Sequence, residues 1–205
     1  PARETSVKES GEPRPPLFVV LGGDVMLQEQ IHSIARERGK GDLAAGYAWF
    51  LERLEPILRG LDDRGDVRFV VNLESPVARQ RREPRSFPPL FNGPPEALQG
   101  LRRAGVDVVT VANNHALDQG RAGMLETVQA AREAGLVVTG AGTTREEAVT
   151  PAVLGEDPSV AVLAYFLRPG SSGEPGRRGV LAVLDEDALA DVKRARTEHD
   201  AVIVT

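Results

Sequence analysis

The chain has 205 residues, a length that fits one domain with a sizeable hydrophobic core. Its 41% hydrophobic and 27% charged residues are typical of globular proteins, and its net charge of -5 argues against nucleic acid as a partner. The absence of cysteine excludes disulfides, thiolate catalysis and cysteine-based zinc sites. No apolar run approaches the ~20 residues of a membrane-spanning helix, so we expect no membrane segment.

Residues 1–16 are rich in Pro, Gly and charged residues, which predicts a flexible lead-in to a domain that covers 17–205. The first residues lack the apolar stretch of a signal peptide. Because the chain starts without Met, either an initiator or a longer leader was removed. We favour the first alternative and a cytoplasmic location over an extracytoplasmic one.

The body alternates short apolar strands with amphipathic helices, which is typical of an α/β sheet. In chain order the pattern predicts a strand at 17–21, helices at 27–38 and 46–60, a strand at 67–71, a helix at 95–104, a strand at 107–112, a helix at 120–134, a strand at 136–138, a short helix after Thr143 and Thr144, a strand at 160–166, a helix at 186–197 and a strand at 200–204. The helix at 46–60 would place Trp49, Phe50, Leu54 and Leu58 on one face.

Apolar runs end repeatedly at residues that could bind a metal. Asp24 follows the first strand, Glu74 the second, and Asn113-Asn114-His115 the next, while the final run ends at Thr205. Ligands gather outside the carboxyl ends of strands in open α/β sheets, where several loops converge. Carboxylate and amide oxygens together with an imidazole suit a divalent cation, so we predict a metal site there.

Each of these positions also has a purely structural interpretation. Asp24 could cap the following helix, and Glu74 could lie in a solvated turn, with Asn72 either orienting it or lining the pocket. His115 could bind metal or transfer protons, and Asp118 could accept its other ring N–H and so select the tautomer. We predict structural or surface roles for His32 and His199, and no dinucleotide site at residues 140–142.

The segment 75–95 is rich in Pro and Arg, a composition typical of a solvated or functional loop. Beside a metal site its arginines, notably Arg82 and Arg85, could bind an anionic substrate, because guanidinium pairs well with phosphate and carboxylate.

Five segments in order resemble the CapA family, which is named for capsule poly-γ-glutamate biosynthesis and belongs to the calcineurin-like metallophosphoesterase superfamily. The segments are Gly23-Asp24-Val25-Met26-Leu27, Asn72-Leu73-Glu74-Ser75-Pro76, Phe91-Asn92-Gly93-Pro94-Pro95-Glu96, residues 112–120 around Asn113-Asn114-His115, and Gly140-Ala141-Gly142. The resemblance implies a sandwich of two sheets flanked by helices, with divalent metal ions (two of Mn, Mg, Ca or Zn) at the strand ends.

By this resemblance Asp24, Glu74 and Asn114 match metal ligands and His115 matches the neighbouring proton-transfer histidine, while Asn72 and Asn113 are expected near the substrate. Two departures stand out. Met26 replaces the superfamily's usual histidine, and the family's later His-Trp-Gly and Gly-His-x-His segments are absent before Thr205. We therefore expect 17–205 to be the N-terminal two-thirds of a CapA-like domain.

The leading hypothesis is a metal-dependent enzyme that acts on a peptide or a poly-γ-glutamate-type substrate. Its alternatives are a metal-dependent peptide epimerase of ribosomal peptide biosynthesis, a phosphoesterase, and a non-catalytic component of capsule assembly that binds a polyanion. The Asn-Asn-His segment with Asp118 favours an enzyme, because a binding surface needs no proton shuttle.

Overall fold

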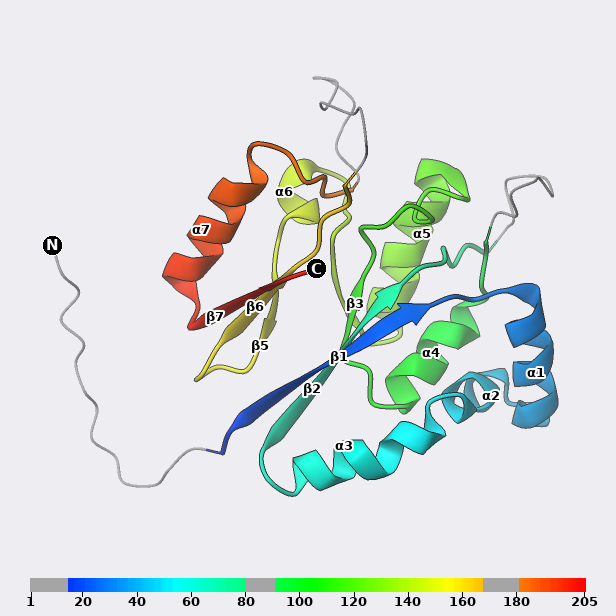
Figure 1. Cartoon of the computed structure of the whole chain (residues 1–205). Helices are drawn as coiled ribbons and strands as arrows, with labels where there is room; N and C mark the ends of the chain where they lie inside the picture. Colours follow the sequence, from blue (N-terminus) through cyan, green and yellow to red (C-terminus); the bar gives the residue numbers. More distant parts are fainter. Residues whose placement is uncertain (1–14, 80–90, 168–180) are drawn as a thin grey trace, which may run out of the picture.

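The computed structural model describes residues 15–79, 91–167 and 181–205 (Figure 1). In chain order its elements are β1 (Leu17–Val25), α1 (Glu29–Gly39), α2 (Leu43–Trp49), the 3-10 helix η1 (Glu52–Leu54), α3 (Glu55–Asp62), β2 (Asp66–Leu73), α4 (Pro95–Arg103), β3 (Val108–Thr110), α5 (Gly120–Glu133), β4 (Val137–Thr139), α6 (Arg145–Ala148), β5 (Ala152–Leu154), β6 (Val160–Leu163), α7 (Ala188–Glu198) and β7 (Ala201–Val204).

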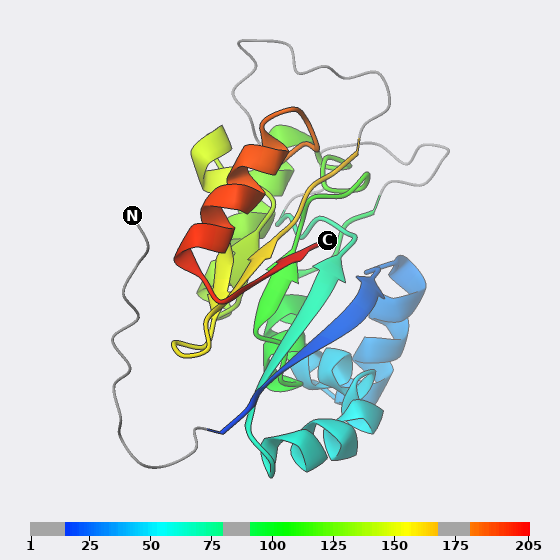
Figure 2. The same ribbon diagram turned by 60° about the vertical axis from the view of Figure 1, so that its left-hand side comes forward.

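The strands form two sheets. The first is wholly parallel in the order β1-β2-β3-β4, and the second has the order β5-β6-β7, with β5 antiparallel and β7 parallel to β6. The carboxyl end of β7 lies at the same end of the molecule as those of β1 and β2 (Figures 1 and 2). The strand ends that carry the candidate residues therefore share one edge of the sandwich.

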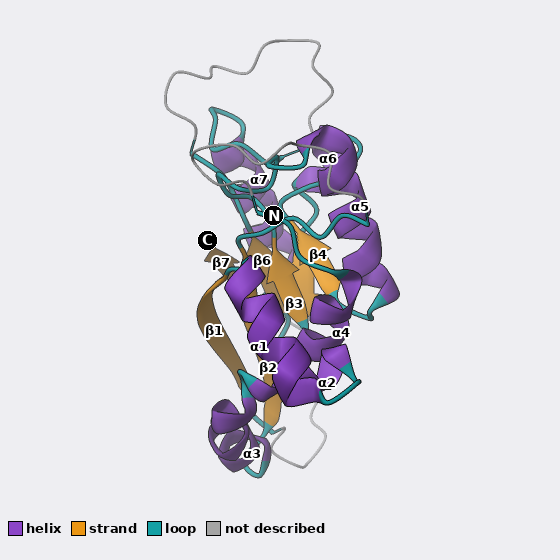
Figure 3. Ribbon diagram, turned by 90° about the vertical axis from the view of Figure 1, so that its right-hand side faces the viewer, coloured by secondary structure: helices purple, strands orange, loops and turns teal. Residues whose placement is uncertain are grey.

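Strands β1, β2 and β3 of the first sheet divide their side chains between two cores. Phe69, Val71 and Leu73 of β2 pack with helix residues in the largest core, whereas Val70 packs against β5 and β6 of the second sheet. Figure 3 shows α1 and α2 in front of the first sheet, α4 and α5 along its right-hand side, and α3 at its lower end. A third core joins the second sheet to α6 and α7. The predicted α/β sandwich of two sheets flanked by helices is thus confirmed.

Most predicted elements agree with the structure to within a few residues, and the predicted helix at 46–60 is wrong. It is divided into α2, η1 and α3, and α3 begins with a proline at its first turn, where the missing N–H costs least. Because the helix is interrupted, its apolar residues no longer share one face. Leu54 and Leu58 pack on the core, while Trp49 and Phe50 are 39% and 36% exposed. Strand β5 was not predicted, because three residues carry too little periodicity.

Parts of the two predicted non-regular segments are not described by the structure. Most of the lead-in at 1–16 and residues 80–90 of the segment 75–95 lie outside the described residues. Within the part of the chain that the structure covers, every helix is too short or too polar to cross a bilayer.

Candidate metal centre

A β-bulge near the end of β1 aims Asp24 at the neighbouring strand. Leu21 pairs with Val70 and Asp24 with Asn72, so Gly22 and Gly23 together lie opposite the single residue between them. A Cβ on Gly22 would come within 2.9 Å of both the Phe69 ring and a Val71 methyl carbon. Bulges re-aim side chains beside functional sites, and here only glycine fits the close approach. Since α1 has Gln28 at its N-cap, Asp24 does not cap this helix.

A row of side-chain amides crosses the sheet from Asp24. The Asn72 amide nitrogen donates to Asp24 Oδ1 at 2.7 Å, and Asn72 Oδ1 accepts from the Asn113 amide at 3.1 Å and from Thr110 Oγ1 at 3.4 Å. The Asn113 amide also donates to the Leu73 carbonyl, and its oxygen accepts from the His115 backbone N–H. Asn72 therefore orients Asp24, and Asn113 links β2 to the turn that carries His115.

Glu74 lies directly after β2 and meets the Asp24 carboxyl group. Its backbone N–H donates to the Val25 carbonyl at 3.0 Å, which extends the β1–β2 ladder beyond the bulge. Partial burial raises the pKa of Glu74, and a hydrogen bond and charge repulsion from Asp24 raise this pKa further, while His115 acts in the opposite direction. Two carboxylates in contact repel each other, and a divalent cation bound between them would offset this repulsion. The pair therefore fits a divalent cation.

His115 and Asp118 form a pair within one turn, three residues apart. His115 Nδ1 lies 2.9 Å from Asp118 Oδ2, and the side chains are 24% and 9% exposed. An ionised carboxylate can only accept, so Nδ1 carries the proton and Nε2 is left as the acceptor of the neutral ring. Nε2 makes no hydrogen bond to any described residue. The ring is thus oriented to exchange a proton at Nε2.

Asn114 is exposed in the same turn, and its amide has no hydrogen-bond partner within the ranges that the structure describes. Its amide oxygen is therefore available to bind a cation, as the predicted ligand role requires. Among the described residues, no three His, Cys, Asp or Glu side chains gather as metal ligands, so the donors available are two carboxylates and amides. Such a hard-oxygen set suits Mg²⁺, Mn²⁺ or Ca²⁺.

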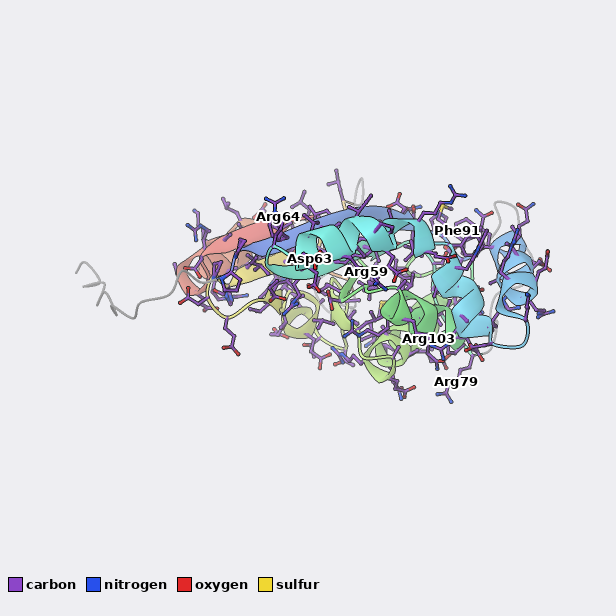
Figure 4. All side chains as sticks on the ribbon, turned by 90° about the horizontal axis from the view of Figure 1, so that it is seen from below. Arg59, Asp63, Arg64, Arg79, Phe91 and Arg103 are labelled. Carbon is purple, nitrogen blue, oxygen red and sulfur yellow. The ribbon has the colours of Figure 1, made fainter. Side chains whose placement is uncertain are left out.

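The arginine-rich segment lies partly outside the described residues. Arg82 and Arg85 lie outside the described residues, and their binding of a substrate stays a prediction. Arg79 contacts two acids of α5, with its backbone N–H on Glu126 and its guanidinium 3.4 Å from Glu133. Figure 4 shows Arg79 pointing outward at the edge of the molecule, on the side of the green helices α4 and α5.

The other two histidines lie elsewhere. His32 bonds to the Tyr47 hydroxyl at 3.0 Å and to Arg36 at 2.8 Å, between α1 and α2. His199 is the C-cap residue of α7. Gly140, at a φ of +97°, lies at a turn beside Ala112. A hollow of about 610 Å³ lies between α5 and the turn before α6, and its lining includes none of the candidate ligands.

Residues 18–205 match the family described as "Bacterial capsule synthesis protein PGA_cap". The chain belongs to this family. The match covers both sheets and every candidate residue of the metal centre.

Proteins with curated names from two organisms align with this chain. "Probable polyglutamine synthesis accessory protein" from Mycobacterium tuberculosis, found in two strains, is 27% identical over 222 aligned positions, which cover 91% of this chain and 58% of the relative. "Capsule biosynthesis protein CapA" from Bacillus anthracis is 26% identical over 127 positions, 62% of this chain and 28% of that protein. The chain thus spans little more than half the length of the mycobacterial relative.

Sequence reasoning missed two residues beside His115. The Phe91 ring packs against the imidazole with centroids 4.4 Å apart, and the buried Gln119 bonds to the Phe91 carbonyl at 3.0 Å. Phe91 is 24 positions from His115 in a segment read as a loop, so neither periodicity nor spacing indicated the contact. Gln119 adjoins the Asn-Asn-His segment, and that proximity was the available signal.

Proposed function

We propose that this chain supplies a divalent-cation site and a proton-transfer histidine to a CapA-like enzyme that acts on a peptide or a poly-γ-glutamate-type substrate. The carrying observation is that the Asp24 and Glu74 carboxyl groups meet at the strand ends beside the His115–Asp118 pair. A binding surface for a polyanion would place cations there, whereas this edge carries acids and an oriented imidazole.

The residues present fit a metal ion on the chemistry of their donors. The Asp24 and Glu74 carboxyl groups lie within hydrogen-bonding reach of each other, and Asn72 fixes one carboxylate through a 2.7 Å bond. A divalent cation bound by Asp24, Glu74 and Asn114 would polarise a substrate oxygen and lower the pKa of bound water. The raised pKa of Glu74 makes loading pH-dependent, since a proton competes for the same oxygen.

His115 performs the proton transfer in this proposal. Asp118 accepts the Nδ1–H, which holds the ring in one tautomer and leaves Nε2 available to take or return a proton. Asn113 fixes the start of the turn, because its Oδ1 accepts from the His115 backbone N–H at 3.1 Å. Holding the base at both its ring and its backbone keeps Nε2 in place for a bound substrate.

The substrate class rests on family membership and on the names of the relatives. One relative is named for polyglutamine synthesis and another for capsule biosynthesis, and the first name supports a peptide or polyglutamate substrate. A cation at two carboxylates would also neutralise an anionic substrate that a protein of net charge -5 otherwise repels. Arg82 and Arg85 remain our candidates for binding substrate carboxylates.

The test compares His115→Asn with His199→Asn in the full-length protein loaded with Mn²⁺. His199 lies at the far end of α7 and serves as the matched control. We expect His115→Asn to keep its metal content and to lose turnover by about 10²- to 10⁴-fold, the usual worth of general acid–base catalysis. His199→Asn should match the wild type.

Candidate substrates separate the alternatives in the same assay. Cleavage of poly-γ-glutamate or a peptide supports the proposal, and deuterium incorporation at an α-carbon in D₂O would indicate an epimerase. Release of phosphate from a generic ester alone would indicate a phosphoesterase. Tight binding of polyglutamate with no turnover would leave a non-catalytic role, and joint loss of metal and activity in His115→Asn would make His115 a ligand.

A further inference from the structure

Phe91 is held in place by the residues that follow His115. Its backbone N–H donates to Asp118 Oδ2 at 2.8 Å, and its carbonyl accepts from the Gln119 side-chain amide at 3.0 Å. Asp118 is 9% exposed and Gln119 is fully buried, so both contacts are protected from water. Both backbone hydrogen-bonding groups of Phe91 are thereby fixed to the turn that carries the imidazole.

The same Asp118 oxygen serves two groups. Oδ2 accepts from Phe91 N–H and lies 2.9 Å from His115 Nδ1, so the backbone of Phe91 helps to orient the carboxylate that orients the imidazole. The Phe91 ring also packs on the imidazole, with a centroid separation of 4.4 Å and an interplanar angle of 43°. The terminal torsion of a histidine is otherwise soft, and a ring against its face restricts it.

The position of Phe91 depends on the segment that follows Glu74. Asn92 forms two hydrogen bonds with the backbone of Ala78, at 2.8 Å to its N–H and 3.0 Å to its carbonyl. Gly93 N–H donates to the Pro76 carbonyl at 2.8 Å. Phe91 therefore lies between the strand end that supplies Glu74 and the turn that supplies His115.

We propose that Phe91 is a positioning residue for His115: its ring holds the imidazole against Asp118 and thereby in one orientation and one tautomer. This inference rests on the proposed function, in which the imidazole of His115 transfers a proton. Phe91 touches no reacting atom in this assignment. It acts only through His115, and this restriction makes the proposal testable.

The first experiment needs no activity. Long-range ¹H–¹⁵N spectra of the metal-free protein, recorded where the imidazole is neutral, report the tautomer of each of its three histidines. We expect a single Nδ1–H tautomer for His115 in the wild type and in Phe91→Tyr, which keeps the ring. Phe91→Leu should give averaged signals. Leu117→Ala, which removes an exposed apolar side chain of the same turn, is the matched control and should resemble the wild type.

The second experiment is a double-mutant cycle on turnover. Phe91→Leu should lower kcat by about 10- to 100-fold with KM within about twofold, because misplacement of a catalytic group acts on the chemical step. In the His115→Asn background the same substitution should have no further effect. Phe91→Tyr, which keeps the ring, should retain most of the wild-type kcat.

The two experiments separate failure of this inference from failure of the proposed function. Unchanged His115 signals in Phe91→Leu would overturn the positioning role, whatever the turnover. An equal loss of kcat in both backgrounds would also overturn it, since Phe91 would then act by a route that bypasses His115. Averaged His115 signals in Phe91→Leu, together with no turnover by the wild type, would support the positioning role and contradict the proposed enzymatic function.

Discussion

We expect Gly22→Ala to damage the metal centre and Gly23→Ala to leave it intact. The two glycines adjoin in the same bulge, yet only a Cβ at Gly22 would meet other atoms, at 2.9 Å from both Phe69 and Val71, while nothing lies within 4 Å of one at Gly23. Phe69 and Val71 are 2% and 3% exposed in the main core and cannot swing aside. The substitution must therefore push β1 outward.

The magnitude follows from the distances. An ordinary contact requires roughly 0.5 Å more than the 2.9 Å available, and overpacking of this kind costs about 1–3 kcal/mol. For a chain of this size, each kcal/mol lowers Tm by about 2–4 °C. The outward shift also moves Asp24 away from Asn72, now 2.7 Å distant, so Mn²⁺ affinity should fall by about 10- to 100-fold.

Circular dichroism melting and calorimetric titration with Mn²⁺ measure the two effects. Gly23→Ala should stay within about 0.5 kcal/mol of the wild type, the usual range for surface substitutions. Equal Tm and equal Mn²⁺ affinity in the two variants would refute the reasoning, because the bulge would then tolerate a side chain at either glycine.

Two further predictions concern charged side chains. The pKa of Glu74 is raised in the folded protein, so its contribution to stability is complete below the unfolded pKa of 4.5 and is lost as pH rises through the raised pKa. A pH series of melts on the metal-free protein should therefore show Tm falling as pH rises above 4.5. Glu74→Gln or saturating Mn²⁺ should flatten this fall. Asp191 is 3% exposed and lies 2.7 Å from Arg145 and 3.1 Å from Arg194, so Asp191→Ala should lower the free energy of unfolding by about 1–3 kcal/mol in a urea titration. Asp187→Ala, an exposed change at the start of the same helix, should cost less than half as much, and a similar cost for both would contradict a buried role for Asp191.

Local pattern was sufficient to predict the strand ends and the pair on one turn. Apolar runs before Asp24, Glu74 and Asn113 predicted strands of an α/β sheet with these residues after their carboxyl ends, and the structure has strands there, which it shows to be parallel. The His115–Asp118 contact joins residues three apart, so it follows from the turn alone. Such features depend on neighbours in the sequence, which is why the sequence determined them.

Contacts between distant residues were decided only by the tertiary structure. Asn72 orients Asp24, 48 positions away, and the bulge at Gly22 that brings them together is set by the packed side chains of β2. Phe91 reaches His115 because Asn92 and Gly93 form hydrogen bonds with the segment after Glu74. The periodicity of the sequence does not indicate these hydrogen bonds. Trp49 and Phe50 likewise lie outside the core, because the segment forms separate helices and the second, α3, has Pro56 in its first turn. Packing against the sheet outweighed the apolar pattern of this one segment.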